Sequence, residues 1–543
     1  MTNSNENLPT SDAAKRPQPV SSPKRDAQVS ELIELTEDYE VRHGKLCGKS
    51  VIYVSMPTKH GTQFVAVEGE IFTQHLRSLG YKRLGRGPTD SVLKEVVQHI
   101  LGRGFGLDPV PVYHRTANVN GKCYINRGPG TNGVVEIDGA GFRIVPEAPV
   151  MFVNDEATGI LPVPIGGGVL EDLQKYFPSI SNEQFPAFVG CLLACLLPEG
   201  AYPILCLVGG QDCAKSMSTE FFRALVDPSI AYDARSTLPS NTEDLFTVAS
   251  SRHVSSFDNV SSLSLEISDA LCRIATGSAY ESRKLYMQNV VNAVRVHSPI
   301  ILNGIALPVS RPDLLSRMVT IELSEIPSGA RKGEQVLRAA FEADHAKLFG
   351  LICSAVSRAL RDVASIQTNL VHRLTDAALF VTAAEPALGL QDGAIVSAWL
   401  ASQRQELLEL ASVDPVGSFL GVASIGKPTV WTGSATDLLG EATRYCAIHS
   451  GYKLPSNFPK SPDVLGRHLT RNLNVLKNAG YAITKLPGRN DGRAWTISRL
   501  DTTPGSIDPQ VKIVRPNPGG VPESMPLAVV SAEPSALRLA GAA

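Results

Sequence analysis

The sequence predicts an α/β protein with a parallel sheet between layers of helix, flanked by two tails that lack a core. Short apolar and β-branched runs at 204–208, 253–258, 299–303 and 318–323 alternate with stretches of helical periodicity. Residues 330–412 have helical periodicity almost throughout. Both ends of the chain are rich in Ser, Asn, Pro or charged residues and have little to bury, so we expect disorder there.

Changes in composition and in hydrophobic periodicity along the chain divide it into six segments. Before the apolar runs, short strand-like stretches separated by Gly/Pro turns, with one helix at 89–101, predict a mixed α/β unit. The predicted segments are a disordered tail (1–30), an N-terminal α/β domain (31–165), an α/β core (166–330), a helical lid region (331–425), a compact basic unit (426–500) and a Pro-rich disordered tail (501–543).

Composition excludes several classes of protein. The chain has 543 residues, with 51 Lys and Arg against 53 Asp and Glu, which argues against a uniformly basic nucleic-acid coat. Its nine cysteines form no CxxC pair, which argues against a disulfide scaffold or a Cys-rich zinc module. No apolar run reaches the roughly 20 residues that a membrane span needs. We therefore expect a cytoplasmic protein without membrane contact.

The most informative segment joins the buried run 204–208 to a helix. It consists of Gly209, Gly210, Gln211, Asp212, Cys213, Ala214, Lys215 and Ser216. A buried strand, a turn and a helix that begins with Lys and Ser is the layout of a phosphate-binding loop, whose backbone N–H groups surround the phosphates. Lys215 would reach the β- and γ-phosphates, and the Ser216 hydroxyl would coordinate Mg²⁺.

Two residues depart from that pattern. Ala214 stands where the consensus has Gly, and Asp212 brings a carboxylate into a loop that would hold phosphates, where like charge lowers affinity. An ordinary surface turn before a helix is the alternative.

Three further signals follow in a consistent order. The run 253–258 ends in Asp258, where a neighbouring parallel strand would present a carboxylate to Mg²⁺. The run 299–303 ends in Asn303, whose amide would orient the attacking water near the γ-phosphate. Arg317 precedes the last strand, in a position suited to an arginine finger. Strand-end turns and a solvated arginine are the alternatives for each signal alone, but the shared order favours an ATPase core.

With these motifs, the sequence resembles the AAA+ ATPases. Within them, it is similar to the superfamily-three-like helicases of phages, plasmids and integrative elements, including ATP-binding relatives of poxvirus-type primase-helicases. The resemblance covers about residues 35–500. It is carried by residues 161–168, 209–216, 257–260, 268–277, 283–286, 301–304, 311–314, 384–389 and 431–436. It implies an ATP-driven DNA helicase or translocase that acts in replication of a mobile element.

The resemblance also implies partners and site roles. The protein would form a hexameric ring, act on single-stranded or forked DNA and meet other replication proteins. Residues 209–216 would bind ATP, Ser216 and Asp258 would hold Mg²⁺, and Asn303 would be the polar sensor. Arg317, or else Arg311, would reach the neighbouring subunit's γ-phosphate.

Two further positions matter in that comparison. Arg283 and Lys284 fall where superfamily-three helicases place a basic pore hairpin, with a solvated helix end as the alternative. Asn259 stands where AAA+ proteins usually have the Glu that polarises water. The hydrolytic base is therefore open: either another carboxylate such as Glu266 supplies it, or hydrolysis is slow.

Residues 426–500 form a basic unit, with 11 Lys and Arg against 4 Asp and Glu. A helix at 434–446, a helix capped by Ser461 that runs to 478, and a hairpin at 481–498 predict a winged helix. The basic residues expected to contact the DNA backbone are Arg467, Arg471, Lys477, Lys485, Arg489 and Arg493. A basic surface for protein contact is the alternative.

Two other classes of function stay open. Asp212, Ala214 and Asn259 motivate a DNA-binding initiator or regulator built on a phosphate loop that hydrolyses ATP weakly or not at all. An ATP-driven protein remodeller is the third class, but it would not need the basic C-terminal unit.

Overall fold

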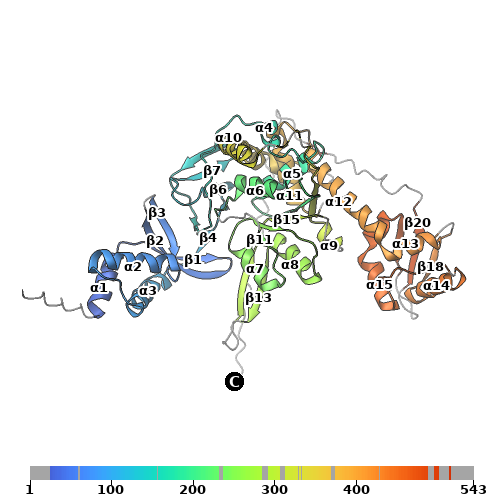
Figure 1. Ribbon diagram of the computed structural model, residues 1–543, viewed down its shortest axis with the longest axis horizontal. Coiled ribbons are helices and arrows are strands. Elements are labelled where there is room, and N and C mark those ends of the chain that lie inside the picture. The colour runs from blue at the N-terminus through green and yellow to red at the C-terminus, as the bar shows by residue number, and fades with distance from the viewer. Residues whose placement is uncertain are drawn as a thin grey trace, which may run out of the picture.

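The computed structural model describes most of the chain between residues 25 and 500, and Figure 1 shows the arrangement of its elements. The described residues are 25–500 and 513–514, except 59–60, 156, 231–235, 284–290, 306–311, 328, 330, 332, 369–372, 427–428, 450 and 487–493. Helix α1 (Arg25–Leu35) begins inside the tail that we expected to reach residue 30, because Gln28 and Leu32 are buried in the N-terminal lobe. Residues 1–24, the rest of that tail, lie outside the described residues.

The N-terminal lobe is an α/β layer with helices on one face of a mixed sheet. Its strands follow the order β3-β2-β1-β4-β9, in which β2 and β3 share one apolar cluster with the three helices, while Val112 of β4 and Met151 of β9 lie in another. The elements are α1, β1 (Val41–Leu46), β2 (Lys49–Thr58), β3 (Gly61–Ala66), α2 (Glu70–Leu84), α3 (Asp90–Phe105), β4 (Val110–Tyr113) and β9 (Met151–Phe152). The mixed α/β texture expected for this region is confirmed.

A second sheet from the same sequence region is antiparallel, and it packs onto the central lobe instead of joining the N-terminal lobe. It consists of β5 (Thr116–Val119), β6 (Lys122–Ile125), β7 (Val134–Asp138) and β8 (Gly141–Val145). Cys123, Ile125, Val135 and Ile137 lie in the cluster that forms the main core. Residues 116–145 are thus part of the central core, although the sequence pattern assigned them to a separate N-terminal domain.

The central lobe is built on a five-stranded sheet in the order β11-β12-β15-β10-β16, and every pairing in it is parallel. Its strands are β10 (Ile204–Val208), β11 (Ser236–Thr237), β12 (Ser255–Asp258), β15 (Ile300–Gly304) and β16 (Met318–Glu322). Every residue of β10 is buried. Parallel sheets need cover on both faces, and successive residues of β10 enter two different apolar clusters. The predicted parallel α/β core is confirmed.

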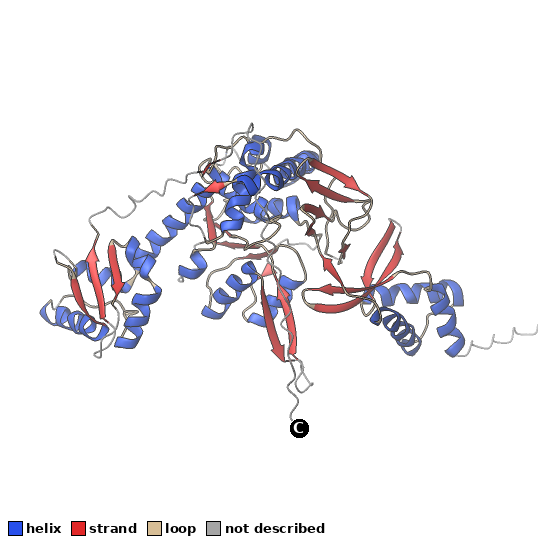
Figure 2. Cartoon of the chain, turned by 180° about the vertical axis from the view of Figure 1, so that it is seen from behind, coloured by secondary structure: helices blue, strands red, loops and turns tan. Residues whose placement is uncertain are grey.

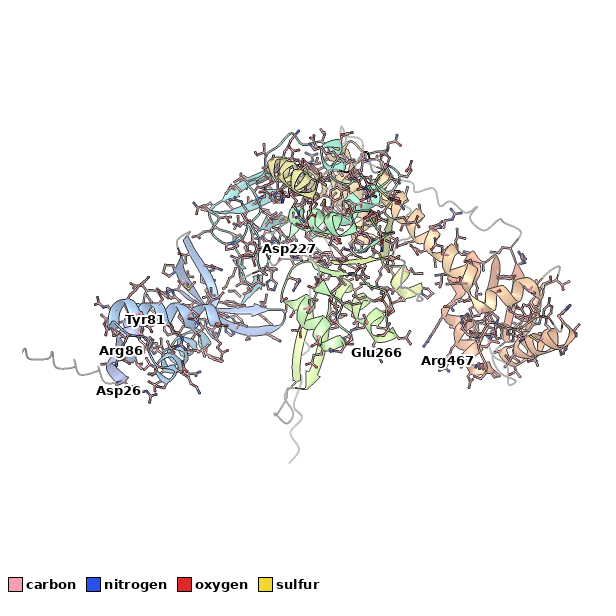
Figure 3. The ribbon with its side chains drawn as sticks, in the orientation of Figure 1. Asp26, Tyr81, Arg86, Asp227, Glu266 and Arg467 are labelled. Carbon is pink, nitrogen blue, oxygen red and sulfur yellow. The ribbon has the colours of Figure 1, made fainter. Side chains whose placement is uncertain are left out.

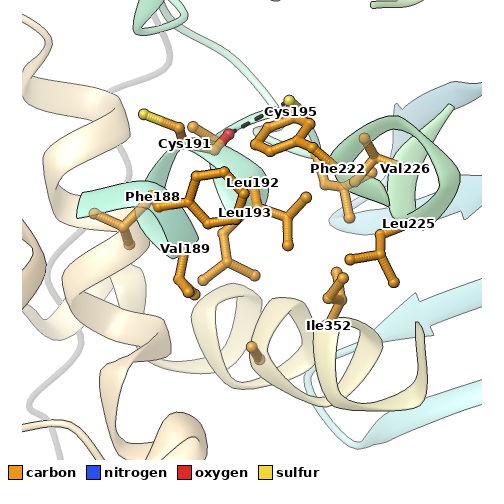
Figure 4. Close-up of a cluster of buried hydrophobic side chains, with 14 of the residues drawn as sticks. Phe188, Val189, Cys191, Leu192, Leu193, Cys195, Phe222, Leu225, Val226 and Ile352 are labelled. Atoms are coloured by element: carbon orange, nitrogen blue, oxygen red, sulfur yellow. Dashed lines mark hydrogen bonds between the residues drawn. The ribbon is translucent and has the colours of Figure 1, made fainter. Parts of the chain in front are cut away.

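Helices cover both faces of this sheet. On one face lie α5 (Phe185–Ala194), α6 (Lys215–Val226), α10 (Glu334–Asp362) and α11 (Thr375–Ala384). On the other face lie α7 (Thr242–Ser250), α8 (Leu265–Thr276) and α9 (Pro312–Leu315). Figure 4 shows the first layer, where Phe188 and Leu192 of α5 meet Phe222 of α6 and Ile352 of α10. Short helices at Leu170–Gln174 (α4), Val363–Ser365 (η2) and Glu385–Leu388 (η3) complete this lobe.

Helix α12 (Ala394–Val413) covers the exposed edge of β16. The Ser402 hydroxyl accepts from the Thr320 N–H and donates to the Thr320 carbonyl, both at 2.8 Å, so a side chain replaces a neighbouring strand. The start of α12 is held by the fully buried carboxylate of Glu385, which accepts from the N–H groups of Gly393 (2.6 Å) and Ile395 (2.8 Å). The motif at 384–389 therefore has a structural role at this helix terminus.

An antiparallel hairpin leaves the core between α8 and β15. It consists of β13 (Ser278–Arg283) and β14 (Val291–Val296), and Figure 2 shows its two strands projecting beyond the helices around them. The alternative expected for Arg283, a solvated helix end, is wrong because this residue ends a strand. Lys284 lies outside the described residues, and so do the side chains of residues 280–294.

The C-terminal lobe combines four helices with a three-stranded antiparallel sheet in the order β18-β20-β19. Its elements are α13 (Pro415–Val422), β18 (Trp431–Ser434), α14 (Ala435–Ile448), α15 (Pro462–Arg471), α16 (Leu473–Asn478), β19 (Tyr481–Lys485) and β20 (Ala494–Arg499). Ser461 caps α15 as expected. The single helix expected to run to residue 478 is two helices, because the chain breaks at Asn472, whose side-chain amide bonds to the His468 ring.

The C-terminal tail contributes one short strand, and the length and hydrophobicity of the helices bear on whether the chain can cross a membrane. Ile513–Val514 (β21) pairs with Gln367–Thr368 (β17), so the tail expected to be disordered from residue 501 adds a short strand to the fold. Among the residues that the structure describes, no helix has the length and apolar character to cross a membrane.

A buried ion network joins the start of the β5–β8 sheet to the central lobe. Asp227 accepts from Arg115 Nε at 3.0 Å and from Arg223 Nη2 at 3.2 Å, and all three residues are buried. Figure 3 shows Asp227 inside the central lobe. Burial alone would raise the pKa of Asp227, but the two arginines outweigh it and lower the pKa to about 2.

We expect Arg115→Ala to lower the free energy of unfolding by about 3–5 kcal/mol, because it leaves a buried carboxylate with one partner fewer. Urea denaturation at pH 7 measures this. Arg77→Ala, which breaks the exposed pair with Asp90, is the control and should cost at most about 1 kcal/mol. Since the pKa of Asp227 is lowered, its stabilisation is present above about pH 4 and is lost as pH falls through 2. Equal effects of the two substitutions would contradict this account.

Candidate functional site

The segment 209–214, called here the 209–214 loop, leaves the carboxyl end of β10 and enters α6 at Lys215. β10 lies between β15 and β16, at the point where the order of strands reverses. In open α/β sheets, ligands bind outside the carboxyl ends of the strands at such a point. The topology therefore places the 209–214 loop where a ligand is expected.

The 209–214 loop adopts a backbone that usually requires glycine. Asp212 (φ 62°) and Ala214 (φ 55°) are both left-handed, although neither is Gly. Gly209 has no room for a side chain, because a Cβ there would lie 2.7 Å from the Leu323 carbonyl oxygen. The residue that replaces the consensus Gly, Ala214, thus keeps the conformation for which Gly is favoured, at a local cost of about 1–2 kcal/mol.

The amine of Lys215 folds back over the 209–214 loop. Its Nζ donates to the Gly209 carbonyl at 2.8 Å and also contacts the Gly210 carbonyl and Cys213 Sγ. The first turn of α6 has no side-chain cap, and its N–H groups have no partner within the helix. An ammonium group and uncapped N–H groups at one helix start suit a phosphate. Ser216, next along the same turn, is half-buried.

The side chain of Asp212 makes an ion pair with a residue of a distant segment. It is 66% exposed, and its Oδ2 lies 3.4 Å from Nη1 of Arg331, which precedes α10. Gln211 is exposed, whereas the Cys213 side chain is buried and donates to the Gly210 carbonyl at 3.1 Å. The carboxylate that argued against a phosphate loop is therefore partly neutralised by an arginine.

Asp258 and Asn303 come together at the carboxyl edge of the sheet, as the sequence predicted. Asn303 Nδ2 lies 3.4 Å from Asp258 Oδ1, and the backbone N–H of Val260 donates to the Asn303 carbonyl at 2.8 Å. The Asn303 amide also bonds Thr219 Oγ1 of α6, at 2.7 Å from Nδ2 and 2.9 Å from Oδ1. Thr219 lies one turn after Lys215, so these contacts tie the start of α6 to Asp258.

Thr219 is a site residue that the sequence reasoning missed. It is fully buried, and its hydroxyl contacts both the Asn303 amide and the Lys215 carbonyl, the latter at 3.2 Å. Its spacing of four residues from Lys215 places both on one face of α6. That spacing was the only available signal, and many core threonines share it.

The residue that follows Asp258 supplies no hydrolytic base, because it is Asn259. Asn259 is left-handed (φ 55°), and its N–H donates to Asp258 Oδ1 at 3.0 Å. Glu266, the candidate carboxylate, is exposed in the first turn of α8, and Figure 3 shows it on the side of the central lobe towards the C-terminal lobe. The structure gives no contact between Glu266 and Asp258 among the described residues.

Arg317 lies at the amino end of the strands, whereas the 209–214 loop lies at their carboxyl end. It directly precedes β16, and its carbonyl accepts from the N–H of Ile204, the first residue of β10. Its side chain is only 10% exposed and is paired with Asp313 at 2.9 Å. The other oxygen of Asp313 lies 2.7 Å from Arg373, whose side chain is 47% exposed. Arg311, the other candidate, lies outside the described residues.

Basic side chains of the C-terminal lobe line a cleft against the central lobe. Arg467 and Arg471 of α15 are exposed, and they face Pro312 and Asp313 across a cleft of about 470 Å³. Figure 3 shows Arg467 on the side of its lobe that faces Glu266. Lys477 and Lys485 are exposed on α16 and β19. Arg489 and Arg493 lie outside the described residues.

The family comparisons match this chain over two stretches. Residues 175–405 match the model of the actinomycete integrative conjugative element replication protein, and residues 419–510 match the model of the C-terminal domain of that RepA family. The chain is similar to replication proteins of mobile elements. This similarity supports the expected role in replication of a mobile element, while AAA+ membership stays a prediction. No curated protein matches the chain.

The solved structures that the chain resembles include two of the apo C-terminal region of NrS-1. They have 11% and 10% sequence identity, TM-scores of 0.39 and 0.37, and each match covers 86% of this chain and 98% of the other. The likeness is too distant to support an argument about the site.

We expect Ala214→Gly to raise the free energy of unfolding by up to about 1 kcal/mol, because it removes the cost of a left-handed Ala. Urea denaturation measures the change. Ala214→Ser keeps a Cβ at the same position and should give no gain. If Ser and Gly stabilise equally, position 214 is not left-handed in solution.

Proposed function

We propose that this chain is a DNA-dependent ATPase, a helicase or translocase, that acts in replication of a mobile element. The observation that carries the proposal is the 209–214 loop at the carboxyl end of β10, with left-handed backbone at residues 212 and 214 and Lys215 folded over it. The family match supports the replication context.

ATP and Mg²⁺ fit the groups at this edge of the sheet. The N–H groups of the loop and of the first turn of α6 would hold the β-phosphate, and Lys215 would exchange the Gly209 carbonyl for phosphate oxygens. The Ser216 hydroxyl and the Asp258 carboxylate are hard oxygen donors that suit Mg²⁺. Asn303 and Thr219 would keep Asp258 in position. Mg²⁺ would neutralise charge that develops on the phosphates, and this chain's own groups would orient them.

The position of the arginines leads us to propose assembly. Arg317 and Arg373 lie at the amino end of the strands, so neither can approach the 209–214 loop of its own chain. A finger role would require a neighbouring copy, packed head to tail, as in a ring. Both arginines would also have to leave Asp313, and Arg373 has the more exposed side chain of the two. A homo-oligomer, such as a hexamer, is therefore part of the proposal.

Two features suit DNA. The β13–β14 hairpin lies in the chain between β12 and β15, the strands that carry Asp258 and Asn303, and its attachment at the amino end of β15 would couple it to a movement of that strand. We interpret the C-terminal lobe as a winged helix, in which α14 and α15 precede the β19–β20 wing. Its exposed Arg467 and Arg471 would bind phosphates of the DNA backbone without reading sequence.

One observation favours a second function, a DNA-binding initiator that binds ATP without turning it over. Asn259 stands where a catalytic Glu would be, and its backbone N–H, not a carboxylate, lies beside Asp258. The two candidates differ in one measurement, since both bind ATP but only the first releases phosphate.

The experiment is phosphate release with and without single-stranded DNA, alongside a native mass measurement. We expect DNA-stimulated turnover by an oligomer. Lys215→Ala should raise the Kd for ATP at least tenfold, because it removes a charge-assisted contact to phosphate. Lys347→Ala, which breaks a partly exposed pair with Asp172, is the control and should leave the Kd unchanged. Unaltered ATP binding by the Lys215 variant would sink the proposal, and binding without turnover at any Mg²⁺ concentration would favour the second candidate.

DNA binding gives a separate prediction. Arg467→Ala and Arg471→Ala should each reduce the slope of log K against log salt concentration by about 1, because each removes one phosphate contact. Fluorescence anisotropy with single-stranded DNA across a salt series measures this slope. Arg444→Ala, an exposed arginine on α14 of the same lobe that is paired with Glu441, should leave it unchanged. Equal slopes for all four proteins would place the DNA elsewhere.

A further inference from the structure

The pair between Asp212 and Arg331 is a feature that phosphate binding does not require. Asp212 belongs to the 209–214 loop, whereas Arg331 belongs to the segment between β16 and α10, 119 residues later. Arg331 makes three contacts: Nη1 to Asp212 at 3.4 Å, Nη2 to Glu325 at 3.1 Å, and Nε to the Ile326 carbonyl at 2.9 Å. The guanidinium is thus held beside the loop by two carboxylates and a carbonyl.

These contacts hold the arginine weakly. The side chains of Arg331, Asp212 and Glu325 are 40%, 66% and 74% exposed. Exposed ion pairs typically contribute little to stability, because water competes for both charges. A guanidinium in such a pair is free to exchange a carboxylate for a stronger acceptor.

A polyphosphate in the 209–214 loop would be that acceptor. It carries more charge than one carboxylate, and its oxygens match the planar fork of arginine. Asp212 is itself part of the loop, so its partner lies within a side-chain length of a phosphate held by the loop's N–H groups. The segment that carries Arg331 starts at β16, and Leu323 at its beginning already touches Gly209.

We propose that Arg331 is a phosphate-binding residue of this site, held by Asp212 until a nucleotide exchanges one anion for the other. The inference rests on the proposed nucleotide site and adds a ligand from the segment that follows β16. It also gives Asp212 a role. Without nucleotide, the carboxylate holds Arg331 beside the loop. Once Arg331 has moved to the phosphate, the same carboxylate repels that phosphate. The exchange would draw the start of α10 towards the nucleotide.

A simpler account is that Arg331 only neutralises Asp212. The two accounts differ in one double-mutant cycle, with affinity for ATP as the readout. If Arg331 binds phosphate, Arg331→Ala lowers ATP affinity about tenfold in the wild-type chain and again in the Asp212→Asn chain. If it only neutralises Asp212, Arg331→Ala costs nothing once that carboxylate is gone.

The experiment titrates ATP, ADP and AMP, each with Mg²⁺, into the full-length wild type, R331A, D212N and the double variant. We expect Asp212→Asn to tighten ATP binding, Arg331→Lys to restore part of the affinity, and the loss in R331A to be smallest for AMP. Arg361→Ala, an exposed arginine of α10 far along the helix from the loop, controls for the lost charge. Unchanged ATP affinity on adding R331A to D212N would overturn the inference while leaving the nucleotide site intact. Absence of ATP binding in the wild type would overturn both.

Discussion

The hydrogen bonds of one buried amide, that of Asn303, set the geometry on which the candidate site depends. This amide contacts Thr219 on α6 and Asp258 at the end of β12, while its backbone lies in β15. A buried amide without partners would cost about 1–3 kcal/mol, so these contacts hold the three elements in one relative position. Because Lys215 lies one turn before Thr219, the same contacts fix the 209–214 loop relative to Asp258.

The loop has left-handed backbone at two positions that hold no glycine. Left-handed backbone at Asp212 and Ala214 carries a steric cost, and the rest of the fold must outweigh it. The fully buried strand β10 and the Gly209 contact with Leu323 supply a rigid base for the loop. The residues that depart from the phosphate-loop consensus are therefore compatible with its geometry, and the ion pair with Asp212 places Arg331 beside the loop.

Local features of the site could be predicted from the sequence, and long-range contacts could not. The strand, turn and helix around Lys215 are contiguous, and Asp258 and Asn303 each end an apolar run, so the sheet edge that they share followed from parallel topology. The pairing of Asp212 with Arg331 joins distant segments that no periodicity connects. The contacts of Asn472 and Arg317 are with partners only four residues away, His468 and Asp313, but that spacing alone does not show that the side chains bond. Those contacts arise only in the folded chain.

The most direct test is a crystal structure of the full chain with a non-hydrolysable ATP analogue and Mg²⁺. The account predicts the β-phosphate on the N–H groups at the start of α6, with Lys215 moved from the Gly209 and Gly210 carbonyls to phosphate oxygens. It also predicts Mg²⁺ between the Ser216 hydroxyl and Asp258. A saturating analogue bound at another place, with Lys215 still on those carbonyls, would contradict it.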